Sequence, residues 1–223
     1  MANSTENDNR ASSGSGYWTE PWPRNRTAIV DLMEIARKRP TIHSAWEVNF
    51  EMPYQRIRTL QRKTGIGISL NAYLIYALAQ SCRDFPLMTA FRWRTRNRIA
   101  FFDGVDVGTA VEWRQPGKPP QAVGARINAA EKKSLASICR EMRDFGRQDP
   151  RLRPAVRFRH KIAGYPRWIR RLVWNRMTSH PERFRKFLGN VGLTNLNFVV
   201  DSQRPVYGFP LSPYTLTLGV GSL

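Results

Sequence analysis

Hydrophobic positions follow two different periods along this chain, and each period predicts a different kind of element. Apolar residues spaced three and four apart predict helices at residues 24–39, 53–63, 68–85, 129–146 and 166–177. Runs of β-branched and aromatic residues predict strands at residues 41–50, 98–102, 105–113, 121–128, 190–200 and 214–220. Asp103-Gly104 is a hairpin signal between two of these strands. Helices placed between mostly β segments predict an α+β fold.

The chain is predicted to hold one domain, because 223 residues are enough for one and short for two. Residues 1–23 begin with a Ser-, Asn- and Gly-rich run that predicts a disordered tail, and residues 24–223 form the domain. The uncharged stretch 64–82 is about long enough to span a bilayer, but its polar side chains favour a buried helix. The start lacks the basic and then apolar regions of a signal peptide, which predicts a cytoplasmic protein.

Composition narrows the chemistry. Hydrophobic residues make up 41% of the chain, enough for a core, which excludes wholesale disorder. Two cysteines, Cys82 and Cys139, can build neither a disulfide framework nor a Cys-rich zinc site, so no metal is predicted. The only histidines that could serve as a base are His43, His160 and His180.

Five segments, in order, resemble motifs of one known family. They are ISLNAYLIYALAQSCRDFPLMTAFRW, FFDGVDVGTAVEW, INAAEKKSLASICREMRDF, NVGLTNLNFVV and PLSPYTLTLGVGS. Together they resemble the catalytic domain of the 2-oxoacid dehydrogenase acyltransferases, over about residues 25–221. The shape is also similar to chloramphenicol acetyltransferase, which shares that fold.

The resemblance implies a mixed sheet flanked by helices, assembled as a homotrimer with active sites at the subunit interfaces. It also implies transfer of an acyl group between coenzyme A and a small acceptor. In that chemistry a histidine removes the acceptor's proton, and a hydroxyl stabilises the tetrahedral oxyanion. The family's serine hydroxyl aligns with Thr194. Thr194 can equally be read as an ordinary β-branched strand residue.

The general base is not identified by the sequence. The family carries its histidine in an Asp-His-Arg-x-x-Asp-Gly motif, and no residues of this sequence match it. His43 lies in a predicted strand, whereas His160 and His180 lie in an arginine-rich stretch where we expect solvated or phosphate-facing side chains. Two hypotheses follow: an acyltransferase, or a non-catalytic member of the family that acts as a binding or assembly module.

A third hypothesis, a basic surface binder, comes from the charge distribution. The chain has 36 Lys and Arg against 17 Asp and Glu, and residues 151–186 hold twelve of the cations and one acid. Residues 166–177 place Trp168 and Leu172 on or near an apolar helix face, with arginines largely opposite. These cations are interpreted as a solvated face, or as a contact for coenzyme A phosphates or an anionic membrane through Arg167, Arg170, Arg171 and Arg176. Nucleic acid is disfavoured because no recognised motif accompanies the charge, although Trp168 and Trp174 could stack on bases.

Overall fold

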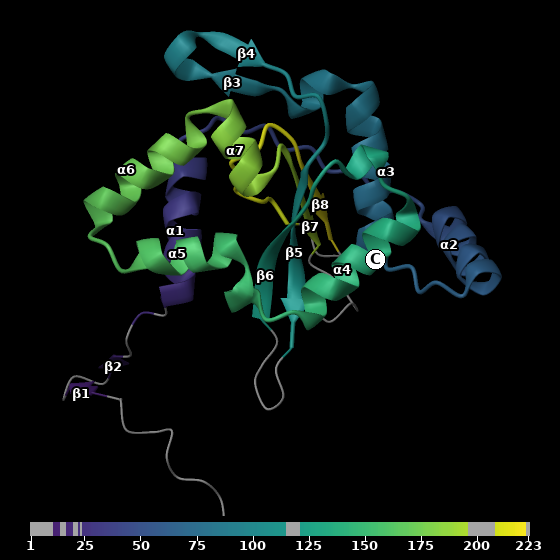
Figure 1. Cartoon of the computed structure of the whole chain (residues 1–223), viewed down its shortest axis with the longest axis horizontal. Coiled ribbons are helices and arrows are strands. Elements are labelled where there is room, and N and C mark those ends of the chain that lie inside the picture. Colours follow the sequence, from purple (N-terminus) through teal and green to yellow (C-terminus); the bar gives the residue numbers. More distant parts are fainter. Residues whose placement is uncertain are drawn as a thin grey trace, which may run out of the picture.

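A computed structural model describes residues 11–13, 17–19, 22, 24–114, 121–195 and 208–221. Its helices are α1 (Arg24–Ala36), α2 (Glu51–Thr64), α3 (Leu70–Asp84), α4 (Leu135–Arg147), α5 (Pro154–Ala163), α6 (Arg167–Thr178) and α7 (Pro181–Leu188). Short 3₁₀ turns are η1 (Pro86–Thr89), η2 (Arg94–Arg96), η3 (Ala130–Lys132) and η4 (Pro150–Leu152). The strands are β1 (Ala11–Ser13), β2 (Tyr17–Thr19), β3 (Phe91–Trp93), β4 (Arg98–Ala100), β5 (Val107–Trp113), β6 (Gln121–Ile127), β7 (Val191–Asn195) and β8 (Thr217–Val220). Figure 1 shows a central sheet with helices on both sides, so the predicted α+β fold is confirmed.

The central sheet has the strand order β6-β5-β7-β8. β5 and β6 are antiparallel neighbours, as the hairpin-like sequence spacing allows. β5 pairs in parallel with β7, and β7 in parallel with β8, with Thr194 opposite Gly219. The sheet is therefore mixed, and its parallel half joins segments that are far apart in the sequence.

One face of the sheet packs against α3 and α4, and this layer holds the main core. α3 begins where the Ser69 hydroxyl accepts a hydrogen bond from the Ala72 amide, and Pro86 follows its end. Its buried side chains pack with those of α4, β5 and β7 in one cluster. The predicted buried helix is confirmed, and within the described ranges no helix is both long and apolar enough to cross a membrane.

The opposite face of the sheet is covered by helices α5 and α7, with α1 and α6 beyond them (Figure 1). Tyr214 packs onto this face across two glycines, and its hydroxyl donates a hydrogen bond to the Leu188 carbonyl at 2.9 Å. A Cβ at Gly108 would lie 2.1 Å from the Tyr214 hydroxyl oxygen, and one at Gly192 would lie 2.6 Å from its ring. Glycine is therefore required at both positions for the helical layer to sit this close.

Two predictions about strands are wrong, one about which strands pair and one about where a strand lies. β4 pairs with β3, in a separate two-stranded sheet, so Asp103-Gly104 does not join β4 to β5 as a hairpin. Instead the chain passes from the small sheet to the central one at this point. Residues 41–50 form no strand; they are an irregular segment, and Ile42 has 96% of its surface exposed. The β-branched and aromatic residues that predicted a strand here do not produce one, because no strand in the described part of the chain pairs with this segment.

The N-terminal segment is only partly described. Most of the predicted tail, residues 1–23, lies outside the described residues, as do residues 115–120 and 196–207. Within residues 1–23, the described strands β1 and β2 pair as a short antiparallel ribbon.

Candidate functional site

Thr194 lies near the end of β7, between β5 and β8 in the central sheet. Its neighbours Leu193 and Asn195 are buried on the α3 side, so alternation along the strand directs the half-buried Thr194 side chain to the opposite face. Among the described residues its hydroxyl has no hydrogen-bond partner. A half-buried hydroxyl without a partner is available to donate a hydrogen bond to a ligand.

Asn195 fixes the position of the strand end. Its side-chain amide donates a hydrogen bond to the Asn71 side-chain oxygen at 2.6 Å, which joins β7 to the first turn of α3. Asparagine is depleted in strands, so its presence next to Thr194 in a buried position is the sequence signal that could have identified this pair. The sequence analysis identified Thr194 but missed Asn195 and Asn71.

The loop of residues 208–211 lies over β8 and also contacts a histidine. A Cβ at Gly219, the partner of Thr194, would lie 3.6 Å from both the Gly208 carbonyl oxygen and the Pro210 ring, so the loop covers β8. Phe209 in the same loop makes an edge-to-face contact with His43, with ring centroids 5.4 Å apart. His43 thus contacts this loop but no described residue of β7, and the prediction that it is a strand residue is wrong, because residues 41–50 form no strand.

The other two histidines lie elsewhere. His160 is exposed on α5. His180 precedes α7 and packs its ring against Trp93 of β3, with centroids 4.8 Å apart. Its buried Nδ1 has no hydrogen-bond partner among the described residues. The described contacts therefore place neither side chain at Thr194.

The cysteines are buried and unreactive. Burial raises the pKa of Cys82 to about 11, and it raises the pKa of Cys139 as well. A thiol in such surroundings stays protonated at neutral pH and is a poor nucleophile. In the described ranges no group of three or more His, Cys, Asp or Glu side chains could hold a metal ion.

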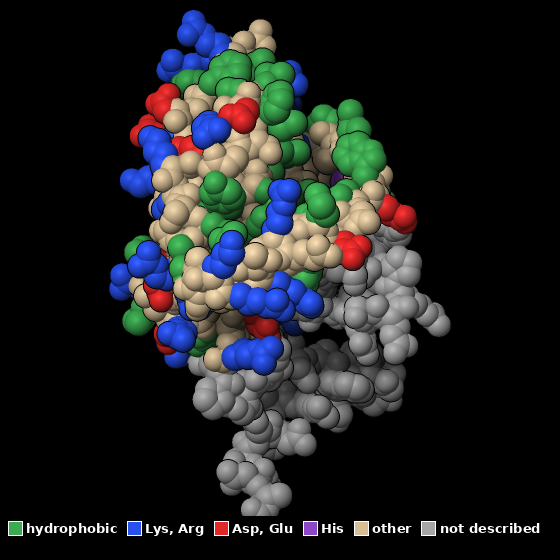
Figure 2. Space-filling view, turned by 90° about the vertical axis from the view of Figure 1, so that its right-hand side faces the viewer, with side chains coloured by type: hydrophobic (Ala, Val, Ile, Leu, Met, Phe, Trp, Pro, Cys, Tyr) green, Lys and Arg blue, Asp and Glu red, His purple; other side chains and the backbone are tan. Residues whose placement is uncertain are grey.

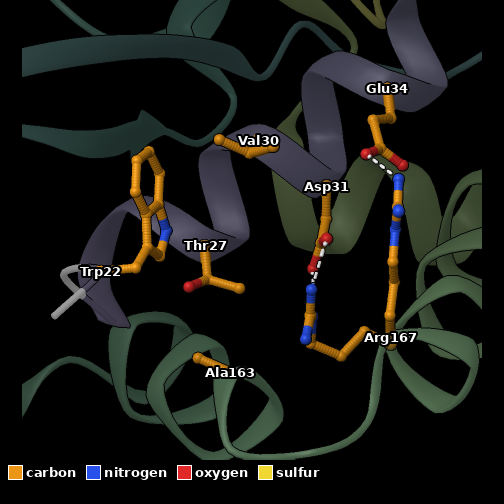
Figure 3. A pocket seen from close by; sticks show the side chains of 8 residues that line it. Trp22, Thr27, Val30, Asp31, Glu34, Ala163 and Arg167 are labelled. Carbon is orange, nitrogen blue, oxygen red and sulfur yellow. Dashed lines mark hydrogen bonds and ion pairs between the residues drawn. The ribbon is translucent and has the colours of Figure 1, made fainter. Parts of the chain in front are cut away.

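Three of the four arginines predicted to meet an anionic partner are paired within the chain. Figure 3 shows one of these pairs, between Arg167 and Glu34, with the ion-paired Asp31 beside it. Arg170 forms an ion pair with the buried Asp31 at 2.8 Å, and its hydrogen bond to that carboxylate raises the pKa of the Arg170 guanidinium. Arg167 and Arg171 share Glu34, at 2.6 and 3.3 Å. These contacts hold α6 against α1, and Arg176 is the member of the four that forms no ion pair with a described residue.

The predicted faces of α6 are partly wrong. Trp168 is 68% exposed, whereas Trp174 is 1% exposed and packs edge-to-face against Phe187. Leu172, expected on or near the apolar face, is also exposed. Trp174 therefore belongs to the core and cannot stack on a base.

Comparison with known proteins places the chain in a family. A family model for the acyltransferase catalytic domain of the 2-oxoacid dehydrogenases matches residues 15–150. The match covers more than half of the chain, and the chain belongs to this family. The comparison with curated proteins finds no matching relative.

Solved structures of that class share the fold. The dihydrolipoamide acetyltransferase of Azotobacter vinelandii superimposes with a TM-score of 0.62 at 12% identity, over 92% of this chain and 72% of that chain. The cubic core of a pyruvate dehydrogenase multienzyme complex gives 0.61 at 13% identity, with the same coverage of both chains. A truncated catalytic core of the 2-oxoacid dehydrogenase complex from Thermoplasma acidophilum gives 0.57 at 14% identity, over 92% of this chain and 79% of that chain. The acyltransferase fold implied by the resemblance is therefore confirmed.

Proposed function

We propose that this chain binds an acyl-CoA thioester and transfers its acyl group to a small acceptor, with Thr194 at the reacting carbonyl. The observation that carries the proposal is the half-buried Thr194 hydroxyl, which has no hydrogen-bond partner among the described residues. It stands at the position that aligns with the family's serine. The related enzyme from Azotobacter vinelandii has a serine, a histidine and an asparagine with roles in its catalytic mechanism.

The proposed reaction needs no covalent enzyme intermediate. The acceptor's nucleophile loses its proton to a base and attacks the thioester carbonyl, which becomes a tetrahedral oxyanion. The Thr194 hydroxyl donates a hydrogen bond to that oxyanion. When the intermediate collapses, the carbon–sulfur bond breaks, and the coenzyme A thiolate takes a proton as it leaves. The Asn195–Asn71 hydrogen bond holds the strand end so that the hydroxyl stays in place.

The proposal includes assembly as a homotrimer, as the resemblance implies. Ile42, Trp46 and Val48 of the irregular segment are largely exposed, and so are Phe209 and Leu211 of the covering loop. An exposed apolar group of this size is typical of an interaction surface. A second copy covering it would bring additional side chains to the Thr194 region. Light scattering should report a trimer, and the Trp46→Glu variant should report smaller species.

Replacement of the hydroxyl tests the proposal. Thr194→Val keeps the shape and β-branching and removes the donor, so kcat should fall by about 10²–10³. Coenzyme A affinity, measured by calorimetry, should stay nearly constant, because the hydroxyl acts on the transition state. Thr194→Ser is the matched control and should retain most of the activity. Equal activity in the valine variant would overturn the proposed role.

The non-catalytic hypothesis remains the second candidate, and one observation favours it. The ring contact of His43 is with Phe209, and in the described part of the chain no histidine is hydrogen-bonded to Thr194. On this hypothesis coenzyme A binds, but acyl transfer to thiols or amines stays at the uncatalysed rate in the wild-type protein. Calorimetry and a transfer assay on the same preparation separate the two candidates.

An anionic contact through α6 remains a prediction. With three of its four arginines paired to α1, that contact would rest mainly on Arg176.

A further inference from the structure

The β3–β4 hairpin carries a concentrated and unpaired positive charge. Four arginines fall within residues 92–98, and all four side chains are exposed: Arg92, Arg94, Arg96 and Arg98. In the described part of the chain none of them forms an ion pair, and Arg96 instead lies over the Trp93 ring at 4.7 Å. The nearest acids in sequence are Asp84, which pairs with Arg83, and the exposed Asp103. The hairpin therefore presents net positive charge directly to the solvent.

Register separates the hairpin into two faces. Phe91, opposite Ala100, is buried against Phe184 of α7, so this side faces the domain. Arg92 is opposite Ile99, and each is the neighbour in its strand of a residue of the Phe91–Ala100 pair, so both side chains lie on the solvent side. Ile99 is largely exposed, in agreement with this assignment.

Exposed apolar side chains lie at the same end of the molecule. The end of β4 is opposite the start of β3, which directly follows η1. Phe101 after β4 is thus brought near η1, which is joined to the end of α3. The large exposed apolar side chains here are Phe85, Leu87, Met88, Ile99 and Phe101. Figure 2 shows hydrophobic side chains gathered at the upper end of the molecule, with Lys and Arg side chains above them.

We propose that this end of the domain docks on an anionic lipid bilayer. We call it the hairpin end and define it by the four exposed arginines and the five apolar side chains: Arg92, Arg94, Arg96 and Arg98, with Phe85, Leu87, Met88, Ile99 and Phe101. The arginines meet lipid phosphates, and the apolar side chains enter the boundary between headgroups and acyl chains. This is an interaction surface separate from Thr194, and it does not depend on acyl transfer.

Three features favour a bilayer over other anionic partners. The hairpin projects from the body of the domain, as Figure 1 shows, which suits a flat partner. Leu87, Met88 and Ile99 are aliphatic and cannot stack on nucleic acid bases as aromatic rings do. Apolar and cationic side chains occur together, and this combination is typical of interfacial membrane segments.

Vesicle cosedimentation of the full chain tests the proposal. Vesicles of phosphatidylcholine and phosphatidylglycerol should bind the wild type, and vesicles of phosphatidylcholine alone should bind it much less. Arg92→Gln with Arg94→Gln should weaken binding by roughly tenfold or more, because each cation near an anionic surface contributes about a fivefold factor. Leu87→Gln with Ile99→Thr should also weaken binding by at least roughly tenfold, because apolar area no longer enters the interface. All four positions are exposed, and circular dichroism checks that each variant is folded.

Matched controls come from the arginine-rich helices. Arg176→Gln with Arg183→Gln removes two exposed cations, and Trp168→Gln with Leu172→Gln removes two exposed apolar side chains. These controls should bind vesicles like the wild type. Binding that is lost only in the controls would overturn the proposal and assign the contact to α6. Binding that needs the hairpin arginines but not Leu87 and Ile99, and that duplex DNA competes away, would overturn it in favour of a nucleic acid site. Absence of binding to anionic vesicles would overturn it as well.

Discussion

The arginines of helices α5 to α7 and those of the β3–β4 hairpin have opposite environments. Seven of the ten arginines between residues 151 and 186 are engaged within the chain by carboxylates, carbonyls or rings: Arg151, Arg153, Arg159, Arg167, Arg170, Arg171 and Arg185. Burial lowers the pKa of Arg153 and of Arg159, which lie against Phe145 and Phe187. The four hairpin arginines are exposed. The longer basic run, which holds more of the chain's cations, is therefore the less available one.

The difference comes from what lies opposite each region. α6 faces α1, whose Asp31 and Glu34 accept three of its arginines. The hairpin packs on the domain through Phe91 and Trp93, and none of its four arginines forms an ion pair with a described residue. Whether an arginine is free to bind an external partner depends on its contacts in the folded chain, and the number of charges along the sequence does not predict those contacts.

The inner face of α6 offers the largest test of this comparison. Trp174→Ala should reduce the free energy of unfolding by about 3–5 kcal/mol, because it removes a fully buried indole from the core. Trp168→Ala, on the exposed side of the same helix, should change it by less than about 0.5 kcal/mol. Urea unfolding of both variants measures the difference. Similar losses would mean that α6 does not pack in the orientation described.

Removal of an ion-paired arginine should lower the free energy of unfolding more than removal of an unpaired one. Arg170→Gln leaves the buried Asp31 carboxylate without its partner and should destabilise the fold by about 3 kcal/mol. Arg94→Gln on the hairpin should have an effect within about 0.5 kcal/mol. Adding Asp31→Asn to Arg170→Gln should recover much of the loss. Equal losses in the two single variants would contradict the contrast between the regions.

The ion pairs of Glu34 should make a smaller contribution to stability, and this contribution should be lost at acid pH. The hydrogen bond from Arg167, aided by that from Arg171, lowers the pKa of Glu34 below its usual value. A carboxyl whose pKa is lowered by folding stabilises the fold above its unfolded pKa and loses that contribution as the pH falls through the folded pKa. Because the pair is largely exposed, the contribution is at most about 1 kcal/mol. The stability difference between wild type and Glu34→Gln should therefore shrink as the pH falls from neutral into the acid range, and a constant difference would count against it.

Much of the fold was predictable from the sequence because local patterns specify local elements. The bounds of α3, β5 and β6 were predicted to within about two residues, because caps, proline and apolar spacing act locally. The end of α4 was also predicted, but its start was placed six residues too early, where the chain forms the separate turn η3. Which strands pair with one another was harder to predict from the sequence. Asp103-Gly104 has residue types typical of a turn, yet β4 pairs with the preceding strand β3 and not with the following strand β5. Only the three-dimensional structure shows which neighbouring strand is the partner.

The candidate site was predicted in part. Thr194 was found through a resemblance, and the sequence pattern alone left it as an ordinary strand residue. The Asn195–Asn71 bond and the contact of His43 with Phe209 join segments separated by more than a hundred residues, and no local pattern reports such contacts. The faces of α6 were misassigned for a related reason. An apolar stripe predicts that some face is buried, whereas the positions of α1 and α7 decide which side that is.

The parallel pairing of β5 with β7 has a consequence for how the chain folds. β5 and β6 can form a local hairpin soon after synthesis, but β7 follows only after α4, α5, α6 and α7. Closing such a long loop has an entropic cost before any parallel contact rewards it, and a topology rich in distant contacts folds slowly. During that interval one edge of β5 and the apolar surface of α3 are open to other chains. We therefore expect refolding yield to fall steeply with protein concentration, since this intermediate can associate before β7 arrives.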